Sequence, residues 1–155
     1  MLSATRAQLP ALLLVLLTAA RASESATTAC PPPWVKFRSL CLVAGCAHKT
    51  WHGSRQTCRS LGGDLVWMTS LEEHRTVSEF YMKNIGRCFN YYLAWTGLHH
   101  NDRGALEWSR RDAGNYRGIG LYMENAKYFV IAGNDVGKFA GFSDPSRMPF
   151  ICRRA

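Results

Sequence analysis

The sequence predicts a single α+β domain, and three observations lead to that prediction. Two segments in which apolar residues recur at helical spacing come first, each with a start signal. The apolar segment 91–98 then has the composition of a strand that is covered on both faces. After it, glycine-rich turns separate short apolar runs, a pattern typical of loop-rich β structure.

The chain has 155 residues, 47% of them hydrophobic and 19% charged, which suits one globular domain. Residues 1–22 have the pattern of a secretory signal peptide: Arg6, an apolar run at 11–17, and the small-x-small site Ala20-Arg-Ala22. A membrane anchor is the alternative, but this run is much shorter than the roughly 20 apolar residues that span a bilayer. We therefore expect a secreted, extracellular protein with no transmembrane segment, a short polar tail at 23–29 and the domain at 30–155.

The predicted mature protein is basic. Loss of Arg6 and Arg21 leaves 17 basic residues against 11 acidic ones, a net charge of about +6. That charge favours anionic partners such as sulfated glycans, acidic surfaces or nucleic acid. Because the basic residues are scattered, a soluble secreted protein with a modest positive bias is the alternative.

The first half of the domain is predicted to be scaffold. Residues 34–42 have the composition of a strand or hairpin, and 64–68 that of a short extended piece. Between them Thr50 is a suitable N-cap for a helix that Gly62-Gly63 ends. The residues at helical spacing in it are Trp51, Arg55, Cys58 and Leu61.

A second helix is predicted to begin at the capping box Ser70-Leu-Glu-Glu73. In such a box the serine hydroxyl and the glutamate carboxylate satisfy each other's free backbone donors. Val77, Tyr81 and Ile85 would line one side of this helix, which ends near Ile85.

The central strand is predicted at 91–98, where Gly97 would let another backbone come close or bend the strand out of the core. Residues 99–104 have the composition of a polar turn. Further strands are expected at 105–108, 128–131 and 138–142, and the segment 147–152 closes the chain.

A set of cysteine, aromatic and glycine positions runs through the domain in a fixed order: Cys30-Pro31, Trp34, Phe37, Cys41, Thr50-Trp51, Cys58, Gly62-Gly63-x-Leu65, Ser70-x-Glu72-Glu73, Trp95-x-Gly97-Leu98, Trp108 and Pro149-Phe150-Ile151-Cys152. Their order and spacing resemble the C-type lectin-like domain family, over residues 30 to 153. Small secreted single-domain members, the perlucin-like and pancreatic-stone-protein-like lectins, are the most similar. The resemblance implies two helices that flank two small antiparallel sheets, paired termini, and a long loop that carries the ligand site.

The six cysteines all follow the signal peptide, so disulfides are expected, although spacing alone does not choose among the pairings. The resemblance implies one pair that matches the family's core bond and one that matches the N-terminal hairpin bond of its longer forms. Two cysteines have no counterpart there, and we expect them to pair with each other. The pairs are, in that order, Cys58–Cys152, Cys30–Cys41 and Cys46–Cys88.

Sugar-binding members of the family hold calcium with a Glu-Pro-Asn or Gln-Pro-Asp triplet in the long loop and a Trp-Asn-Asp triplet in a later strand. Calcium needs several oxygen ligands, which these triplets supply. Here the first triplet is matched only by Glu124-Asn125, without a proline, and the second is replaced by Phe139-Ala140-Gly141. We therefore expect no cofactor and no metal; bound calcium would have to use other ligands.

Basic and tyrosine residues gather in and beside the later loops. Arginine and tyrosine suit contacts with sulfate, carboxylate and sugar rings, although a solvated rim is the alternative. Arg153-Arg154 is expected to be a solvated tail. The candidate ligand-binding residues are Arg110, Arg111, Tyr116, Arg117, Tyr122, Glu124, Asn125, Lys127 and Lys138.

No enzyme is predicted. His48 and His52 have a spacing that metal ligands use on helices, but the glutamate of a zinc protease motif is missing. His99-His100 adjoins a turn and is expected to be solvated. No catalytic nucleophile motif is present in the sequence.

Two functions remain after this reasoning. The first is a secreted C-type-lectin-like protein that recognises carbohydrate through an atypical, calcium-independent site. The alternative is a structural or protein-interaction module of an extracellular or mineralised matrix that presents a basic surface. The expected partners are glycans, including anionic or sulfated ones, or extracellular proteins, and not nucleic acid.

Overall fold

The computed structural model describes residues 29–88, 91–123 and 125–155. The predicted signal peptide at 1–22, and the polar tail at 23–29 except for its last residue, lie outside the described residues. Within the described ranges, no helix has both the length and the apolar character needed to cross a membrane.

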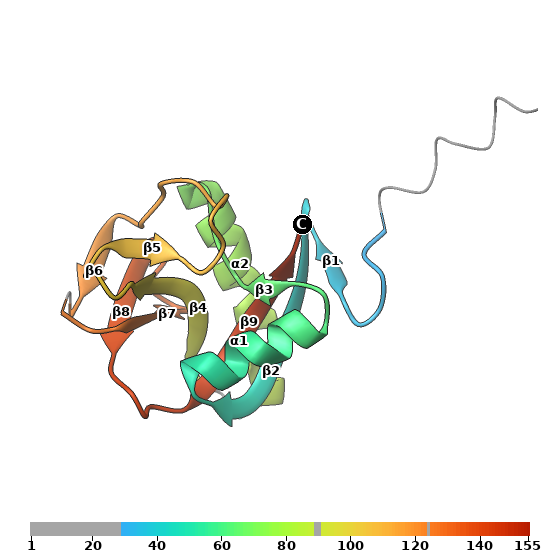
Figure 1. The fold of residues 1–155 in the computed structure, drawn as a ribbon. Helices are drawn as coiled ribbons and strands as arrows, with labels where there is room; N and C mark the ends of the chain where they lie inside the picture. The colour runs from blue at the N-terminus through green and yellow to red at the C-terminus, as the bar shows by residue number, and fades with distance from the viewer. Residues whose placement is uncertain (1–28, 89–90, 124) are drawn as a thin grey trace, which may run out of the picture.

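The architecture is α+β, as predicted, with two helices and a mixed sheet (Figure 1). The elements in chain order are β1 (Val35–Phe37), β2 (Leu40–Lys49), α1 (Trp51–Ser60), β3 (Asp64–Leu65), α2 (Leu71–Asn84), the 3-10 turn η2 (Ile85–Cys88), β4 (Leu93–His100), β5 (Leu106–Trp108), β6 (Gly120–Tyr122), β7 (Tyr128–Ala132), β8 (Lys138–Phe142) and β9 (Met148–Arg154).

The strands form one hydrogen-bonded sheet in the order β1-β2-β9-β4-β7-β8-β6, with β3 paired to β9 and β5 paired to β4. The two small antiparallel sheets expected from the resemblance are therefore joined, through a parallel pairing of Trp95 on β4 with Phe150 on β9. The parallel pairing of β6 with β8 also differs from the expectation. The last strand lies against β2, so the described termini are paired as predicted (Figure 1).

Two apolar clusters hold the helices to the sheet. One packs α1 against it around Trp51, Cys58 and Trp95. The other packs α2 against it around Val77 and Tyr81. Residues 94–98 of β4 are fully buried, which confirms the prediction of a strand covered on both faces.

The predicted helix starts are present. The Thr50 hydroxyl accepts a hydrogen bond from the Gly53 amide (3.2 Å) and caps α1. The Ser70 hydroxyl accepts one from the Glu73 amide (3.2 Å) and caps α2. The Glu73 carboxylate, however, accepts from the Thr69 amide (2.8 Å), one residue earlier than a capping box predicts.

Several predicted boundaries were wrong. The central strand begins at Leu93 and continues to His100, so the two histidines extend a strand instead of lying in a polar turn. They do so because they pair with β5, His99 opposite Glu107 and His100 opposite Leu106. Their rings also contact backbone carbonyls: His99 Nδ1 lies 3.1 Å from the Gly97 oxygen and His100 Nδ1 lies 2.7 Å from the Ala126 oxygen. Strand β2 runs to Lys49, and β6 was not predicted.

The C-terminal arginines do not form a solvated tail. Both belong to β9, and the Arg153 side chain is only 12% exposed. Its guanidinium donates to the Trp67 carbonyl (2.8 Å) and to both carboxylate oxygens of Glu73 (2.7 and 2.9 Å). The expectation failed because the Glu73 carboxylate on α2 lies where β9 ends, a long-range contact that local sequence does not predict.

The cysteines pair as expected from the sequence. The three disulfides are Cys30–Cys41, Cys46–Cys88 and Cys58–Cys152.

Candidate functional site

Gly97 brings two distant segments together on one side of the molecule. A Cβ atom at this position would lie 2.5 Å from Ser109 Oγ and 3.2 Å from the Leu65 carbonyl oxygen. The Gly97 amide donates to the Val66 carbonyl (2.9 Å), and its carbonyl accepts from the Ser109 amide (2.7 Å). The close approach predicted at Gly97 therefore occurs, and it places Ser109 beside β3.

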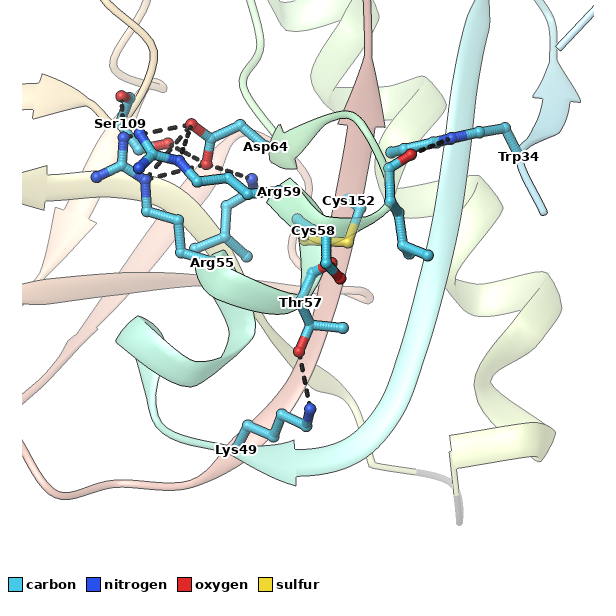
Figure 2. Close-up of a disulfide and its surroundings, with 12 residues drawn as sticks. Trp34, Lys49, Arg55, Thr57, Cys58, Arg59, Asp64, Ser109 and Cys152 are labelled. Atoms are coloured by element: carbon cyan, nitrogen blue, oxygen red, sulfur yellow. Dashed lines mark hydrogen bonds and ion pairs between the residues drawn. A yellow bond between two sulfur atoms is a disulfide. The ribbon is translucent and has the colours of Figure 1, made fainter. Parts of the chain in front are cut away.

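Arg55 of α1 is fixed where these segments meet (Figure 2). Its guanidinium donates to Asp64 Oδ1 (3.1 Å) and Oδ2 (3.3 Å) and to the Ser109 carbonyl (2.6 Å). Asp64 is buried and also accepts from the Leu65 amide (2.8 Å). Arg59 lies one helical turn further along α1, with its Nε 3.6 Å from Asp64 Oδ2.

A groove of about 900 Å³ opens beside this ion pair. We call it the arginine groove, because α1 supplies two arginines to it and the segment after β5 supplies three. It is lined by Arg55, Arg59, Asp64, His99, Glu107, Trp108, Ser109, Arg110, Arg111, Gly114, Asn115 and Arg117.

Arg110 is oriented by an aromatic ring and a carboxylate. Its guanidinium lies 4.5 Å from the centre of the Trp67 ring, which the Arg153 guanidinium also contacts at 4.5 Å. It also donates to both oxygens of the exposed Asp112. This hydrogen bonding raises the pKa of Arg110, so the group stays charged at every relevant pH.

Arg117 and Tyr116 hold the loop between β5 and β6. The half-buried Arg117 donates to the carbonyls of Leu106 (3.1 Å), Gly114 (3.0 Å) and Tyr116 (2.9 Å). Tyr116 does not line the groove, because its hydroxyl lies inside, 3.2 Å from Nδ1 of the buried His74. Of these two candidate residues, Arg117 lines the groove, whereas Tyr116 supports the loop from beneath.

A smaller hollow of about 300 Å³ continues from the arginine groove and shares Arg55, His99 and Glu107 with it. His99 Nε2 lies 3.8 Å from Glu107 Oε1. Burial lowers the pKa of His99, so this imidazole is neutral at pH 7. The basic character of the groove therefore comes from its arginines.

The remaining candidate residues do not line the arginine groove. Lys127 lines the smaller hollow and, with Asn125, an adjoining hollow of about 470 Å³, where Lys127 Nζ pairs with Asp102 Oδ1 (2.9 Å). Lys138 on β8 lies 3.5 Å from Asp135 and does not line the arginine groove. Tyr122 belongs to β6, and Glu124 lies outside the described residues.

The positions that would supply calcium ligands in the family pattern do not fit that ion. The Phe139 side chain is buried and packs against the His74 ring (centroids 4.6 Å apart). Any side chain at Gly141 would begin 2.5 Å from the Met123 carbonyl oxygen. Neither residue, nor Ala140 between them, has a side-chain oxygen, which calcium requires. In the part of the chain that the structure describes, no three His, Cys, Asp or Glu residues are grouped to hold a metal.

Sequence reasoning missed the half of the groove that α1 supplies. Arg55 was placed only among the residues at helical spacing, and Arg59 was not singled out. A signal was present, since two arginines four residues apart are followed by an aspartate at a strand start. That signal is weak in the sequence alone, because the arginines meet the rest of the groove only through the contact of Gly97 with Ser109.

Comparisons with known proteins agree with this fold. Residues 47–154 match the family described as "Lectin C-type domain". The chain is 27% identical over 100 residues to a perlucin-like protein of Mytilus galloprovincialis, which covers 60% of this chain and 64% of that protein. It is 33% identical over 64 residues to C-type lectin domain family 4 member C of Homo sapiens, covering 41% of this chain and 28% of that protein. The chain therefore spans less than two thirds of the length of these curated relatives.

Solved structures show the same fold at low sequence identity. Human lithostathine superposes with a TM-score of 0.64 at 19% identity, over 81% of this chain and 90% of that one. The calcium-independent C-type lectin SPL-2 of Saxidomus purpuratus superposes with a TM-score of 0.65 at 16% identity, over 81% of this chain and 93% of that one.

Proposed function

Because this chain belongs to the C-type lectin domain family, we propose that it is a secreted protein that binds carbohydrate without calcium, at the arginine groove. The observation that carries the proposal is the groove itself: a preformed polar cavity of about 900 Å³ on a scaffold of α1, β3 and β5. Ligand sites in proteins are concave, preformed and of about this size.

The groove chemistry suits a sugar. Saccharides present many hydroxyls, each of which can donate and accept a hydrogen bond. The carboxylate of Glu107 accepts such bonds, the arginines donate them, and Asn115 and Ser109 can do both. The hydrogen bonds that fix Arg55 and Arg117 in the groove wall also preorganise it, which lowers the cost of ordering on binding.

Two observations support the proposed calcium independence. The β8 positions that the family pattern assigns to calcium carry Phe139, Ala140 and Gly141, which have no oxygen to offer. The hollow beside them, lined by Met123, Asn125, Ala126 and Ser143, shares no residue with the arginine groove. SPL-2, a fold neighbour described as calcium-independent, is a precedent for such a protein within this fold.

Secretion and the absence of catalysis belong to the same proposal. Three disulfides suit an oxidising, extracellular compartment. Binding without catalysis is the usual activity of this fold.

A glycan array, run once with millimolar calcium and once with chelator, tests the proposal. We expect the same glycans to bind under both conditions. Asn115→Trp should block binding by filling the groove, while the matched variant Asn125→Trp, in an exposed loop outside it, should not. Binding that disappears in chelator, or that only Asn125→Trp removes, would place the site at the usual calcium position instead. If no glycan binds under either condition, the matrix-module alternative is favoured.

A further inference from the structure

The five arginines of the groove differ in how much of their hydrogen-bonding capacity is already used. Arg55, Arg110 and Arg117 each make two or more hydrogen bonds to other groups of the protein. These three guanidiniums form part of the groove wall. Their positive charge can attract a ligand, but many of their N–H donors are already used in hydrogen bonds within the protein.

Arg59 and Arg111 are the two groove arginines with open forks, by which we mean guanidinium N–H donors that make no hydrogen bond within the described residues. The Arg59 side chain is 60% exposed, and its contact with Asp64, at 3.6 Å, is too long for a hydrogen bond. Arg111 is exposed and makes no hydrogen bond or ion pair with any residue that the structure describes. Arg59 comes from α1 and Arg111 from the segment after β5, so each segment that lines the groove presents one free guanidinium.

The fixed charges of the lining leave an excess of positive charge. Five arginines stand against two carboxylates, Asp64 and Glu107. Asp64 is shared by Arg55 and Arg59, so it cannot neutralise both. Even with Asp112, which pairs with Arg110, the arginines outnumber the carboxylates, so the two open forks lie in a net positive field.

We infer that Arg59 and Arg111 bind the sulfate or carboxylate groups of an acidic saccharide, which deepens the proposed function and rests on it. A planar guanidinium fork meets a sulfate or carboxylate with two parallel hydrogen bonds. Glu107 is 48% exposed and accepts from Asn101 Nδ2 (3.0 Å), and its remaining lone pairs can accept from saccharide hydroxyls. A run of phosphates offers this carboxylate no hydrogen-bond donor, whereas saccharide hydroxyls do, which favours a saccharide over single-stranded DNA.

The test measures binding of the full mature chain to a heparin tetrasaccharide and to its desulfated form, in chelator. Arg59→Gln with Arg111→Gln removes both open forks. Arg87→Gln with Arg147→Gln removes the same charge from two exposed arginines outside the groove. We expect the groove pair to weaken binding of the sulfated form by about tenfold or more and the control pair to change it less than about twofold. Wild-type protein should prefer the sulfated form, and that preference should shrink as salt rises.

Four outcomes would overturn the inference. An equal loss in both variants would mean that only overall charge matters. Equal wild-type binding of both saccharides, unchanged in the groove pair, would leave glycan recognition standing without an anion subsite. Equally tight binding of a single-stranded oligonucleotide would remove the selectivity for saccharide. If neither saccharide nor any neutral glycan binds, the proposed function fails as well.

Discussion

Gly97 and Ser109 lie so close that a Cβ atom on the glycine would come within 2.5 Å of the serine hydroxyl. This contact joins the central strand β4 to the segment that carries three of the groove arginines. It also sets Ser109 where its carbonyl accepts a hydrogen bond from Arg55. A scaffold position buried in the sheet therefore determines the shape of an exposed groove.

Replacing Gly97 with alanine should destabilise the fold and disturb the groove together. We expect a loss of about 2 kcal/mol in the free energy of unfolding, because the added methyl must displace Ser109 and the β3 backbone. Gly120→Ala is the matched control, since its nearest side-chain atom would be 3.7 Å away, and it should change stability by less than about 0.5 kcal/mol. Urea unfolding with the disulfides intact measures both. If the two variants lose the same unfolding free energy, Ser109 and β3 can move to accommodate a methyl group at position 97 at little cost.

Arg153 should contribute to stability, in contrast to its neighbour in sequence. Arg153→Ala removes three hydrogen bonds and leaves Glu73 without its ion-pair partner, at a cost of about 2 kcal/mol in unfolding free energy. Arg154 is exposed, so Arg154→Ala should lie within about 0.5 kcal/mol of wild type. If the two variants unfold at the same denaturant concentration, β9 frays before Arg153 and the ion pair is not stabilising.

Because its imidazole is buried, His74 should lower the stability of the fold in mild acid. Burial lowers its pKa to about 4, while Asp135 opposes that shift only weakly. In the unfolded chain its pKa is about 6.5. Between about pH 4 and 6.5 the unfolded state therefore binds a proton that the folded state does not bind. The stability that neutral His74 contributes is complete above pH 6.5 and is lost as the pH falls towards 4, by up to about 3 kcal/mol.

The variant His74→Asn isolates this contribution, because it keeps a polar partner for the Tyr116 hydroxyl and cannot titrate. Unfolding free energies between pH 4 and 6.5 should fall less steeply for the variant than for wild type. The Glu73 carboxyl contributes to the pH dependence of the unfolding free energy in both proteins. Burial alone would raise the pKa of its carboxyl, but hydrogen bonds from Arg153 and the Thr69 amide outweigh burial and lower it. Parallel curves for the two proteins would show that His74 does not cause the acid sensitivity.

The disulfide between Cys46 and Cys88 ties β2 to the end of the second helical segment and should matter for stability. It bridges a sequence separation of 42 residues, for which loop entropy gives about 4 kcal/mol. Cys46→Ala with Cys88→Ala should therefore lower the unfolding free energy by several kcal/mol while the other two bonds form normally. Non-reducing peptide mapping of wild type should recover the 46–88 peptide pair. A disulfide-linked dimer through either cysteine would contradict the assignment.

Much of the scaffold could be predicted from local signals. Thr50, Ser70 and the glycines after α1 act within one helical turn, so their effects are visible in the sequence. Apolar residues on both alternating sets of positions in 91–98 likewise predicted a strand covered on both faces. This signal is local, because it depends only on the composition of the strand itself.

The groove could be predicted only in part, because it depends on contacts between distant residues. Arg110, Arg111 and Arg117 were found because they share one loop. Arg55 joins them only through Asp64 and Ser109, which are 9 and 54 residues away in sequence. Arg153 was misjudged for the same reason, since its partner Glu73 is 80 residues away.

The central claim is that a glycan occupies the arginine groove without calcium. Backbone amide spectra of isotope-labelled protein, titrated in chelator with a glycan that the array identifies, test it most directly. The account predicts shifts concentrated at residues 55–64 and 107–117, with the same pattern after calcium is added. Shifts concentrated at 123–126 and 139–143, or shifts that develop only once calcium is present, would contradict it.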